Sequence, residues 1–450
     1  MKILLAASEI VPFAKTGGLA DVAGALPKAL ARRRQDVRVV MPRYRTVDPK
    51  AHRLKLLPDI MRIPVGGKIV PARLWEGKVG RDVPAYFVDI PQYFDRPQLY
   101  RTADGDYPDN AERFVAFARA ALETAKAVDF KPDVIHCHDW QSALIPTYLK
   151  TLYANDAFFG RTGTIFTIHN IAYQGLFHPE ALYLAGLGWT EFTPDRLEFY
   201  GQVNFLKGGL LDADLINTVS PTYAREIQSG PDFGRGLEGL LRARAADVFG
   251  VLNGLDGDEW DPEDDQFLPA TFSAKVRKGK AVCKARLQAE TGLAADSAIP
   301  LIGIVSRLDP QKGLDLILSA LDEILATAQL IILGSGDRPI QEALASAAGR
   351  HAGRFAYHQG FDNSLAHRIY AGSDLFLMPS RFEPCGLGQL IAMRYGTVPV
   401  VTRTGGLADT VQAFDAKAGS GTGFVCAAQT VEAVLAGVRE AVATFHSADR

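Results

Sequence analysis

Short runs of β-branched and apolar residues alternate along the chain with longer stretches in which apolar residues recur at helical spacing. This alternation constrains the fold more than any other feature, because it is typical of parallel strands that are joined by crossover helices. The pattern pauses near residue 250 and then starts again, so the sequence predicts two α/β halves. The strand-like runs are residues 2–8, 36–41, 85–90, 133–137, 164–168, 215–219, 301–306, 329–333, 354–359, 374–378 and 398–401. The helical patterns are residues 18–33, 110–128, 314–325, 339–348, 365–372 and 387–395.

A cluster of glycine, aspartate and proline at residues 251–262 separates the two halves and is the predicted interdomain linker. The predicted domains are therefore residues 1–250 and residues 263–450. A chain of 450 residues suits two to three domains at roughly 150 residues each. Each half is expected to be a doubly wound, Rossmann-like domain, in which ligands bind beyond the carboxyl ends of the strands. We expect these ends to border an interdomain cleft, with the aromatic-rich residues 177–207 as an insertion around it.

The charge and cysteine content exclude several classes of protein. Lys and Arg number 49 and Asp and Glu number 51, which gives a net charge of −2. That balance offers no electrostatic basis for binding nucleic acid or an anionic membrane. The four cysteines are scattered without a CxxC pair, so neither a disulfide framework nor a thiolate zinc site is predicted. The first apolar run, residues 3–8, is too short for a signal peptide or a membrane span, which favours a cytoplasmic protein with an unprocessed N-terminus.

The first candidate site is the loop at residues 8–21, between the first predicted strand and the first predicted helix. Gly17 and Gly18 let the backbone approach a ligand closely, and the helix that follows offers N–H groups and a positive dipole to an anion. Lys15 adds a mobile positive charge. The same residues are equally compatible with a structural strand-to-helix turn that carries an exposed lysine. Neither GxGxxG nor GxxxxGK[ST] occurs here, so dinucleotide and P-loop sites are not indicated.

Histidines end two further predicted strands. His136 and His138 are two residues apart, so strand alternation puts them on one face, and Asp139 follows directly. A metal site is one interpretation, although no further ligand stands nearby at helical spacing; hydrogen bonds that hold the loop are the other. His169 and Asn170 end the next strand, where they either bond sugar hydroxyls or only cap the strand end.

In the second half, two loops after strands combine charges with glycines. Arg307 and Lys312 follow one strand and together suit a diphosphate, because Arg grips phosphate oxygens in bidentate fashion and Lys acts as a point charge. Glu383 follows another strand, just before glycines that open a helix, so its carboxylate can hold sugar hydroxyls beside N–H donors for phosphate. The alternatives are solvated surface charges for the two cations and an N-terminal helix charge for Glu383.

Taken in order, the motifs of the chain resemble the family of bacterial glycogen synthases and plant starch synthases. The resemblance extends over about residues 2–425, and the ordered set of motifs carries it rather than any one of them. The matching motifs are Lys15-Thr16-Gly17-Gly18-Leu19-Ala20-Asp21-Val22, His138-Asp139-Trp140, His169-Asn170, Asn253-Gly254-Leu255-Asp256, Ser306-Arg307-Leu308, Gln311-Lys312-Gly313, Glu383-Pro384-Cys385-Gly386-Leu387 and Arg403-Thr404-Gly405-Gly406-Leu407-Ala408-Asp409-Thr410-Val411.

The resemblance implies a GT-B glycosyltransferase that extends an α-1,4-glucan from ADP-glucose with retention of configuration, and thus a role in glycogen biosynthesis. It implies ADP-glucose as donor and glycogen or another α-1,4-glucan as acceptor. No cofactor and no metal are expected, because side chains supply the charge balance at the cleft and no ligand cluster has metal spacing. Catalytic roles at the transferred glucose and the diphosphate are implied for His169, Arg307, Lys312 and Glu383. Substrate-binding roles are implied for Lys15, Gly17, Gly18, Asp21, Asp139, Asn170, Asn253, Phe361, Cys385, Gly386 and Leu387.

Some positions depart from the wider pattern of retaining GT-B enzymes. Eight positions after the first glutamate, where many of them carry a second one, this chain has Ile391 with Gln389 nearby. That arrangement is similar to glycogen and starch synthases and unlike sucrose- or trehalose-type relatives. Phe361 stands where a tyrosine is expected and Gly388 where a threonine is typical. The last helical pattern, residues 431–445, is expected to continue the second domain, so the chain to residue 450 is expected to lack the family's terminal crossover helix.

Other functions fit parts of the sequence. A glycoside hydrolase needs two carboxylates, which Asp21, Asp139 and Glu383 could supply, but the paired cations would then have no purpose. A glucan phosphorylase has the same architecture, but no lysine stands in a convincing context for pyridoxal phosphate. A non-catalytic glucan-binding or regulatory protein would be expected to lose the charged donor-site residues. A glucan synthase that uses UDP-glucose also remains an alternative.

Overall fold

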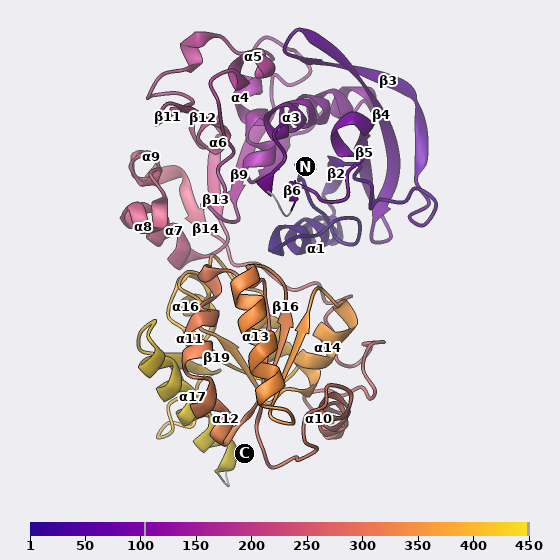
Figure 1. Cartoon of the computed structure of the whole chain (residues 1–450). Helices are drawn as coiled ribbons and strands as arrows, with labels where there is room; N and C mark the ends of the chain where they lie inside the picture. The colour runs from indigo at the N-terminus through magenta and orange to yellow at the C-terminus, as the bar shows by residue number, and fades with distance from the viewer. Residues whose placement is uncertain (103–104, 448–450) are drawn as a thin grey trace. The chain divides into compact units, whose positions relative to one another are not determined.

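The computed structural model describes residues 1–102 and 105–447 and contains two compact units (Figure 1). The first unit comprises Met1–Val219 and Ala224–Gly254, and the second comprises Ser220–Tyr223 and Leu255–Arg450. The chain thus leaves the first unit at Gly254, within the segment of residues 251–262. Each unit is built on its own largely parallel sheet with helices against it, so the chain is an α/β protein with two doubly wound domains.

The sheet of the first unit has nine strands in the order β14-β13-β9-β8-β1-β2-β5-β4-β3. It is parallel from β14 to β5, whereas β4 and β3 continue it as an antiparallel pair. Its strands are β1 Lys2–Ala6, β2 Asp36–Pro42, β3 Lys55–Val65, β4 Lys68–Val79, β5 Val83–Asp89, β8 Val134–His138, β9 Gly163–Ile168, β13 Leu215–Thr218 and β14 Val248–Gly250.

The strand order of this sheet reverses at β1. Strands β2 and β5 extend it to one side, and β8, β9 and β13 extend it to the other. A crevice opens beyond the carboxyl ends of the strands at such a switch point, because the loops that follow the two central strands turn in opposite directions. The loop after β1 contains the glycine pair at Gly17 and Gly18. Strand β8 ends at His138, and the loop after it begins at Asp139.

Helices and short strands complete the first unit. Helix α3 (Asn110–Ala127) is its central helix, with 14 of its residues buried. The other helices are α1 Gly18–Arg32, α2 Pro91–Phe94, α4 Leu144–Lys150, α5 Ala181–Ala185, α6 Phe205–Asp212, α7 Pro221–Ser229, α8 Pro231–Gly234 and α9 Glu238–Ala243, with 3-10 turns at Trp140–Ser142, Trp189–Glu191 and Ala245–Asp247. The first residues of α7, up to Tyr223, group with the second unit. The remaining strands are β6 Arg101–Thr102 and β7 Gly105–Asp106, which pair with each other, and β10 Leu176–Phe177, β11 Glu198–Phe199 and β12 Gln202–Asn204, which form a small antiparallel sheet within residues 177–207 and just before them.

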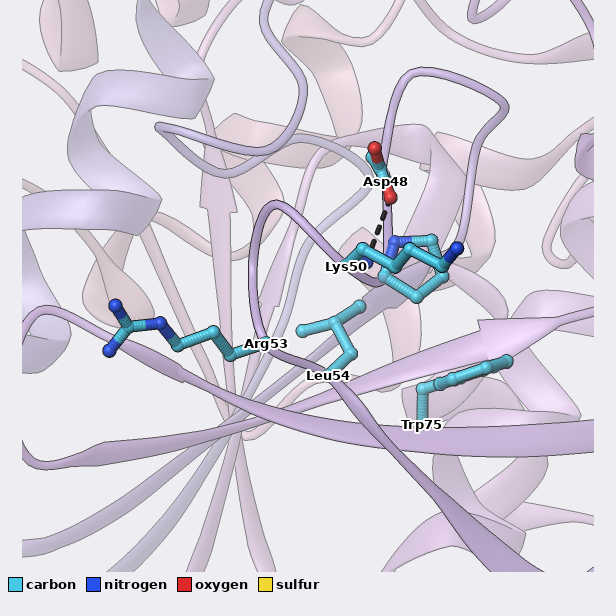
Figure 2. Close-up of a pocket in the computed structure, with 6 residues that line it drawn as sticks. Asp48, Lys50, Arg53, Leu54 and Trp75 are labelled. Carbon is cyan, nitrogen blue, oxygen red and sulfur yellow. Dashed lines mark hydrogen bonds between the residues drawn. The ribbon is translucent and has the colours of Figure 1, made fainter.

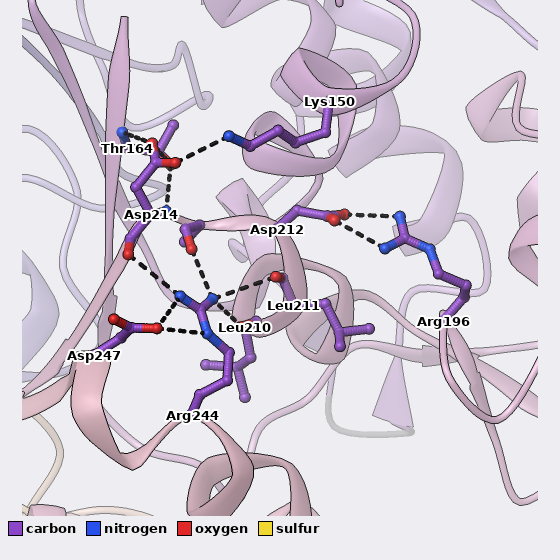
Figure 3. A network of polar contacts seen from close by, with 10 residues as sticks. Lys150, Thr164, Arg196, Leu210, Leu211, Asp212, Asp214, Arg244 and Asp247 are labelled. Atoms are coloured by element: carbon purple, nitrogen blue, oxygen red, sulfur yellow. Dashed lines mark hydrogen bonds and ion pairs between the residues drawn. The ribbon is translucent and has the colours of Figure 1, made fainter.

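A polar network closes the end of α6 (Figure 3). The guanidinium of Arg244 donates to the carbonyl oxygens of Leu210 at 2.8 Å and Ala213 at 2.6 Å, which a helix end otherwise leaves unpaired. Arg196 makes two hydrogen bonds to the carboxylate of Asp212, at 2.9 and 3.1 Å. The other end of α6 receives the loop after β9, because the Phe205 N–H donates to the Gly175 carbonyl at 3.0 Å. The network therefore fixes the helix that supports the loop of His169.

The second unit has a six-stranded parallel sheet in the order β17-β16-β15-β18-β19-β20. Its order reverses at β15, so the switch point lies between β15 and β18. One apolar cluster packs on each face of the sheet, the first around Leu330 and Leu377 and the second around Ile331 and Phe376. The strands are β15 Leu301–Val305, β16 Gln329–Gly334, β17 Phe355–Gln359, β18 Leu375–Met378, β19 Val398–Thr402 and β20 Phe424–Cys426.

The helices of the second unit differ from the predicted pattern at three places, because α10 and α16 were not predicted and one predicted helix is divided. Residues 314–325 were expected to form one helix, but they belong to two, α11 and α12, because the helical geometry is interrupted at Ala320. The helices are α10 Lys278–Glu290, α11 Leu314–Ser319, α12 Leu321–Thr327, α13 Arg338–Arg350, α14 Asn363–Gly372, α15 Gly388–Arg394, α16 Gly405–Thr410 and α17 Val431–His446, with a 3-10 turn at Pro310–Lys312. Among the residues that the structure describes, no helix combines the length and apolar character needed to cross a membrane.

Candidate functional site

Two charged residues meet at the switch point of the second unit. Lys312 lies in the loop after β15 and Glu383 in the loop after β18, the strand next to it. The Lys312 Nζ is 2.6 Å from the Glu383 Oε2, and the Ser380 hydroxyl donates to the same oxygen at 3.0 Å. Both charges are largely withdrawn from solvent, with side-chain exposures of 16% for Lys312 and 7% for Glu383. The two predicted catalytic residues are therefore direct partners.

The two loops are also joined through Gln311. Its side-chain amide donates to the Phe382 carbonyl at 3.0 Å, and its backbone carbonyl accepts the Arg381 N–H at 2.8 Å. Gly313 adopts a left-handed φ of +66°, and a Cβ atom there would lie 2.2 Å from the Pro379 carbonyl oxygen. Only glycine permits this approach. The contacts of Gln311 and Gly313 thus fix the backbone of the loop that carries Lys312.

The loop after β19 supports Glu383 from the other side. Gly405 opens helix α16 with a φ of +41°, and a Cβ atom there would lie 2.0 Å from the Glu383 carbonyl oxygen. The Gly406 N–H donates to that oxygen at 3.1 Å. The glycines that echo the first glycine loop therefore serve close packing of backbone against the Glu383 loop.

The segment after Glu383 is held by a buried amide. Gln389 donates to the carbonyl oxygens of Cys385 at 2.9 Å and Gly386 at 3.0 Å, and also to the Thr410 hydroxyl at 3.1 Å. Cys385 is buried and Gly386 has a φ of +74°, while Leu387 directly precedes α15. The predicted residues Cys385, Gly386 and Leu387 thus form one turn at the start of α15, with their backbone conformation fixed by Gln389.

Arg307 and Phe361 are the more exposed residues of this half of the site. The Arg307 side chain is 45% exposed, and its guanidinium lies 3.5 Å from the Asp309 carboxylate. Phe361 follows β17 and is 72% exposed. Both lie in loops after the carboxyl ends of strands, where the sequence predicted them, and their side chains are accessible to a ligand.

In the first unit, the glycine loop is organised by Glu9. The carboxylate of this buried residue accepts hydrogen bonds from the Thr16 hydroxyl at 2.6 Å, the Gly17 N–H at 3.3 Å and the Tyr100 hydroxyl at 2.7 Å, and also from the Thr16 N–H. The loop was expected to offer its N–H groups to a ligand anion. The Thr16 and Gly17 N–H groups instead bond an anion that belongs to the protein.

Lys15 was expected to be a mobile charge, but it forms an ion pair. Its Nζ lies 2.6 Å from the Asp21 Oδ1, with side-chain exposures of 29% and 17%. Asp21 is in the first turn of α1, where the helix dipole favours a negative charge. Gly17 and Gly18 stand at the start of that helix, and a Cβ atom at Gly17 would meet no atom within 4 Å. The space beside Gly17 is therefore open to a ligand.

Three histidine rings lie together at the ends of β8 and β9. His136 and His138 share a face of β8 as predicted, with ring centroids 4.2 Å apart. The His138 Nδ1 is 2.8 Å from the His169 Nε2, and the Asp139 carboxylate accepts the His169 N–H at 2.7 Å. Desolvation lowers the pKa of His136 to about 4 and that of His169 to about 3, and lowers that of His138 as well. All three rings are therefore neutral at pH 7.

Asp139 combines a strained backbone with a buried carboxyl group. Its φ is +55°, a conformation that costs a non-glycine residue free energy. Burial raises its pKa to about 7, although the N–H groups of His169 and Asn170 act in the opposite direction. Asp139 therefore has both a strained backbone and a shifted pKa, a combination that is typical of functional sites.

The remaining predicted residues have plainer settings. The Asn170 side chain accepts the Ala172 N–H at 3.0 Å and so closes its own turn after β9. Asn253 lies after β14, in the last residues of the first unit. The residues that the sequence reasoning missed are Glu9, Tyr100 and Ser380. Glu9 lies inside the loop at residues 8–21, but its partner Tyr100 is 91 residues away, and no local sequence pattern connects the two.

An open surface pocket of about 690 Å³ lies outside these loops, beside β4 (Figure 2). It is lined by Asp48, Pro49, Lys50, Arg53, Leu54 and Trp75, none of which is a predicted site residue. The described residues contain no group of three or more His, Cys, Asp or Glu side chains placed to hold a metal ion.

Residues 2–243 match the family described as starch synthase catalytic domain, and residues 299–444 match glycosyl transferases group 1. The glycogen synthase of Syntrophotalea carbinolica is 49% identical over 446 residues, which cover 99% of this chain and 92% of that protein. The glycogen synthase of Elusimicrobium minutum is also 49% identical, over 94% of this chain and 88% of that protein.

Among solved structures, the chain is again similar to a starch synthase. The catalytic domain of starch synthase IV from Arabidopsis thaliana, bound to ADP and acarbose, superposes with a TM-score of 0.93. It is 35% identical, and the match covers 100% of this chain and 92% of that one. Sucrose-phosphate synthase from Thermosynechococcus elongatus, at 18% identity and a TM-score of 0.59, shares the fold.

Proposed function

The chain belongs to the family of glycogen and starch synthases, and we propose that it transfers glucose from ADP-glucose to the non-reducing end of an α-1,4-glucan with retention of configuration. Membership in this family makes it a glycosyltransferase of the glycogen synthase type. The observation that carries the proposal to the level of residues is the Lys312–Glu383 pair at the switch point of the second sheet.

The second unit is proposed to bind the nucleotide sugar. Departure of a nucleoside diphosphate leaves negative charge on phosphate oxygens, and fixed cations that already point at this charge lower the barrier. Lys312 is preorganised by its loop, whereas Arg307 is exposed and able to turn from Asp309 to a phosphate. The two residues would then clamp the diphosphate, with the accessible Phe361 ring beside the base.

Glu383 is proposed to hold the donor sugar. Its carboxylate accepts from Lys312 and Ser380 through Oε2. The other carboxylate oxygen, Oε1, is then the acceptor that Glu383 can direct at a sugar hydroxyl or at positive charge that develops on the sugar ring. The turn at Cys385, Gly386 and Leu387 would present its backbone to the same ligand.

The first unit is proposed to contribute the groups around the reacting sugar and the glucan. Lys15 and Asp21 form one charged pair beside the open space at Gly17. His169, with Asp139 and Asn170 around it, offers a neutral imidazole that hydrogen-bonds hydroxyl groups without bringing a charge. Asn253 is proposed as a further substrate-binding residue.

ADP-glucose is the proposed donor because the structure of Arabidopsis starch synthase IV, which is 35% identical to this chain, has ADP bound. The test measures transfer of radiolabelled glucose from ADP-glucose and from UDP-glucose to glycogen, side by side. We expect a higher kcat/KM with ADP-glucose and no requirement for an added cofactor.

The Lys312→Met variant keeps the length of the side chain but removes its charge, and Lys275→Met is its matched control at an exposed position of the same unit. We expect the first to lose transfer and the second to keep it. Preference for UDP-glucose would replace the proposed donor. Glycogen binding without transfer from either donor would indicate a non-catalytic glucan-binding protein.

A further inference from the structure

His138 is buried between two other histidine rings at the carboxyl end of β8. Its side chain is fully buried, with the ring of His136 at 4.2 Å on one side and the ring of His169 at 5.1 Å on the other. Of these residues, only His169 is implied in the reaction. The contact that matters is between the His138 Nδ1 and the His169 Nε2, at 2.8 Å.

Only one proton lies between these two nitrogens. Burial and the neighbouring rings lower the pKa of both histidines, so both are neutral near pH 7. A neutral imidazole has one N–H group and one lone pair, so one ring donates and the other accepts. The choice decides which nitrogen of His169 carries its proton.

The surroundings of His138 decide between the two arrangements. Its other nitrogen, Nε2, is buried, and no described residue hydrogen-bonds it. If His169 donated, His138 would carry its proton on Nε2 as a buried N–H without an acceptor. If His138 donates, Nε2 is only an unused acceptor. Orphaned buried N–H groups are rarer in proteins than under-satisfied acceptors.

We propose that His138 is a positioning residue that donates its Nδ1–H to His169 Nε2 and thereby holds His169 as the tautomer with its proton on Nδ1. His169 then has one fixed donor, Nδ1–H, for a substrate oxygen, and its Nε2 is occupied. The part of this inference that concerns substrate rests on the proposed function, whereas the tautomer itself does not.

The tautomer is measured directly by ¹⁵N–¹H correlation spectra of the protein labelled with ¹⁵N-histidine, because protonated and bare ring nitrogens have well separated shifts. The His169→Gln and His138→Asn spectra assign the two rings. We expect His169 with a protonated Nδ1 and a bare Nε2, and His138 with a protonated Nδ1. A protonated Nε2 on His169 overturns the proposal, whether or not the protein transfers glucose.

Kinetics test the consequence. His138→Leu removes the donor and should lower kcat by about 10- to 100-fold, by analogy with the loss of a residue that orients a metal-binding histidine, with a much smaller change in the donor KM. His138→Asn places an amide N–H near the position of Nδ1 and should restore most of kcat. The control is His136→Gln, at a partly buried histidine on the same strand, whose Nε2 bonds Thr167 at 2.6 Å and which should keep kcat.

The outcomes separate the two hypotheses. If neither the wild type nor any variant transfers glucose from either donor, the proposed function fails, and the spectra alone decide on the tautomer. If the wild type is active and folded His138→Leu shows no difference from His136→Gln in kcat, His138 does not position His169. Loss of activity in His138→Asn together with an unchanged His169 spectrum would also contradict the proposal.

Discussion

Lys312 and Arg307 carry the same charge but differ in burial, so removing each should have a different consequence for stability. Either substitution by Ala should lower transfer by at least about 100-fold, as loss of one preorganised donor does. Lys312→Ala also leaves the Glu383 carboxylate, 7% exposed, with Ser380 but without its cation. We expect it to cost about 1–3 kcal/mol of unfolding free energy. Arg307→Ala, at a side chain 45% exposed, should leave the thermal midpoint nearly unchanged.

The double variant Lys312→Ala/Glu383→Gln separates the two effects of Lys312. A neutral amide needs no counter-charge, so thermal unfolding should show most of the lost stability restored while transfer stays low. Glu383→Gln alone should lower turnover more than it weakens binding of free ADP, measured by calorimetry. Near-normal turnover in both single cation variants would contradict the diphosphate assignment.

At the level of single residues, the sequence predicted charge types and loops but not partners. The Lys312–Glu383 pair joins positions 71 residues apart, and only the order of the strands brings their loops together. Glu9 was not assigned a role in the sequence analysis, because one of the hydrogen-bond partners of its carboxylate is Tyr100, 91 residues away in the chain. Residue type indicates what a side chain can do, and the fold determines with which group.

At the level of elements, the glycines that open α1 and α16 look alike in sequence but should respond differently to substitution. A Cβ atom at Gly405 would lie 2.0 Å from the Glu383 carbonyl oxygen, so Gly405→Ala must displace the Glu383 loop. Stability and transfer should both fall. Gly17 has an extended φ of −158° and open space, so Gly17→Ala should fold normally and reduce only substrate affinity, if a ligand approaches there.

Gly419→Ala is the control for left-handed backbone alone. Gly419 has a φ of +60° and no atom within 4 Å of an added Cβ, so only strain of about 1–2 kcal/mol is expected, with transfer retained. Thermal melts and kinetics on the three variants check these expectations. Full stability of Gly405→Ala would contradict the packing role, and unchanged KM values in Gly17→Ala would remove Gly17 from the binding site.

Every strand that the sequence predicted in the two parallel sheets is present, with ends within two residues of the prediction. Buried parallel strands consist of nearly continuous apolar residues, which are easily recognised. The pair β3 and β4 was not predicted, because β3 contains Pro58 and Pro64, which are unfavourable within a strand, and is exposed over most of its first half. Strand β20 has only three residues, too few for a periodic pattern.

At the level of the whole molecule, the first unit contains desolvated titratable groups whose effects on stability have opposite signs as the pH falls. The folded state keeps His136, His138 and His169 neutral, although they bind protons below about pH 6.5 when unfolded. These three groups make stability rise with pH between about 4 and 6.5. Burial raises the pKa of Asp139 to about 7 and also raises that of Glu9, so these carboxyls bind protons in the folded state first. Asp139 makes stability fall over the same range, and Glu9 acts in the same direction.

The slope of stability against pH should therefore change in opposite directions when one member of each set is replaced. Each proton contributes about 1.4 kcal/mol per pH unit where only one state binds it. His136→Gln removes a proton that the unfolded state binds, so the rise between pH 4.5 and 6 should become shallower by up to this amount. Asp139→Asn removes a proton that the folded state binds, so the rise should become steeper. The measurement is urea unfolding at several pH values by tryptophan fluorescence, to which Trp75, Trp140 and Trp189 report from the first unit. Equal slopes in all three proteins would mean that His136 and Asp139 titrate alike in the folded and unfolded states, which their desolvation in and just after β8 should not allow.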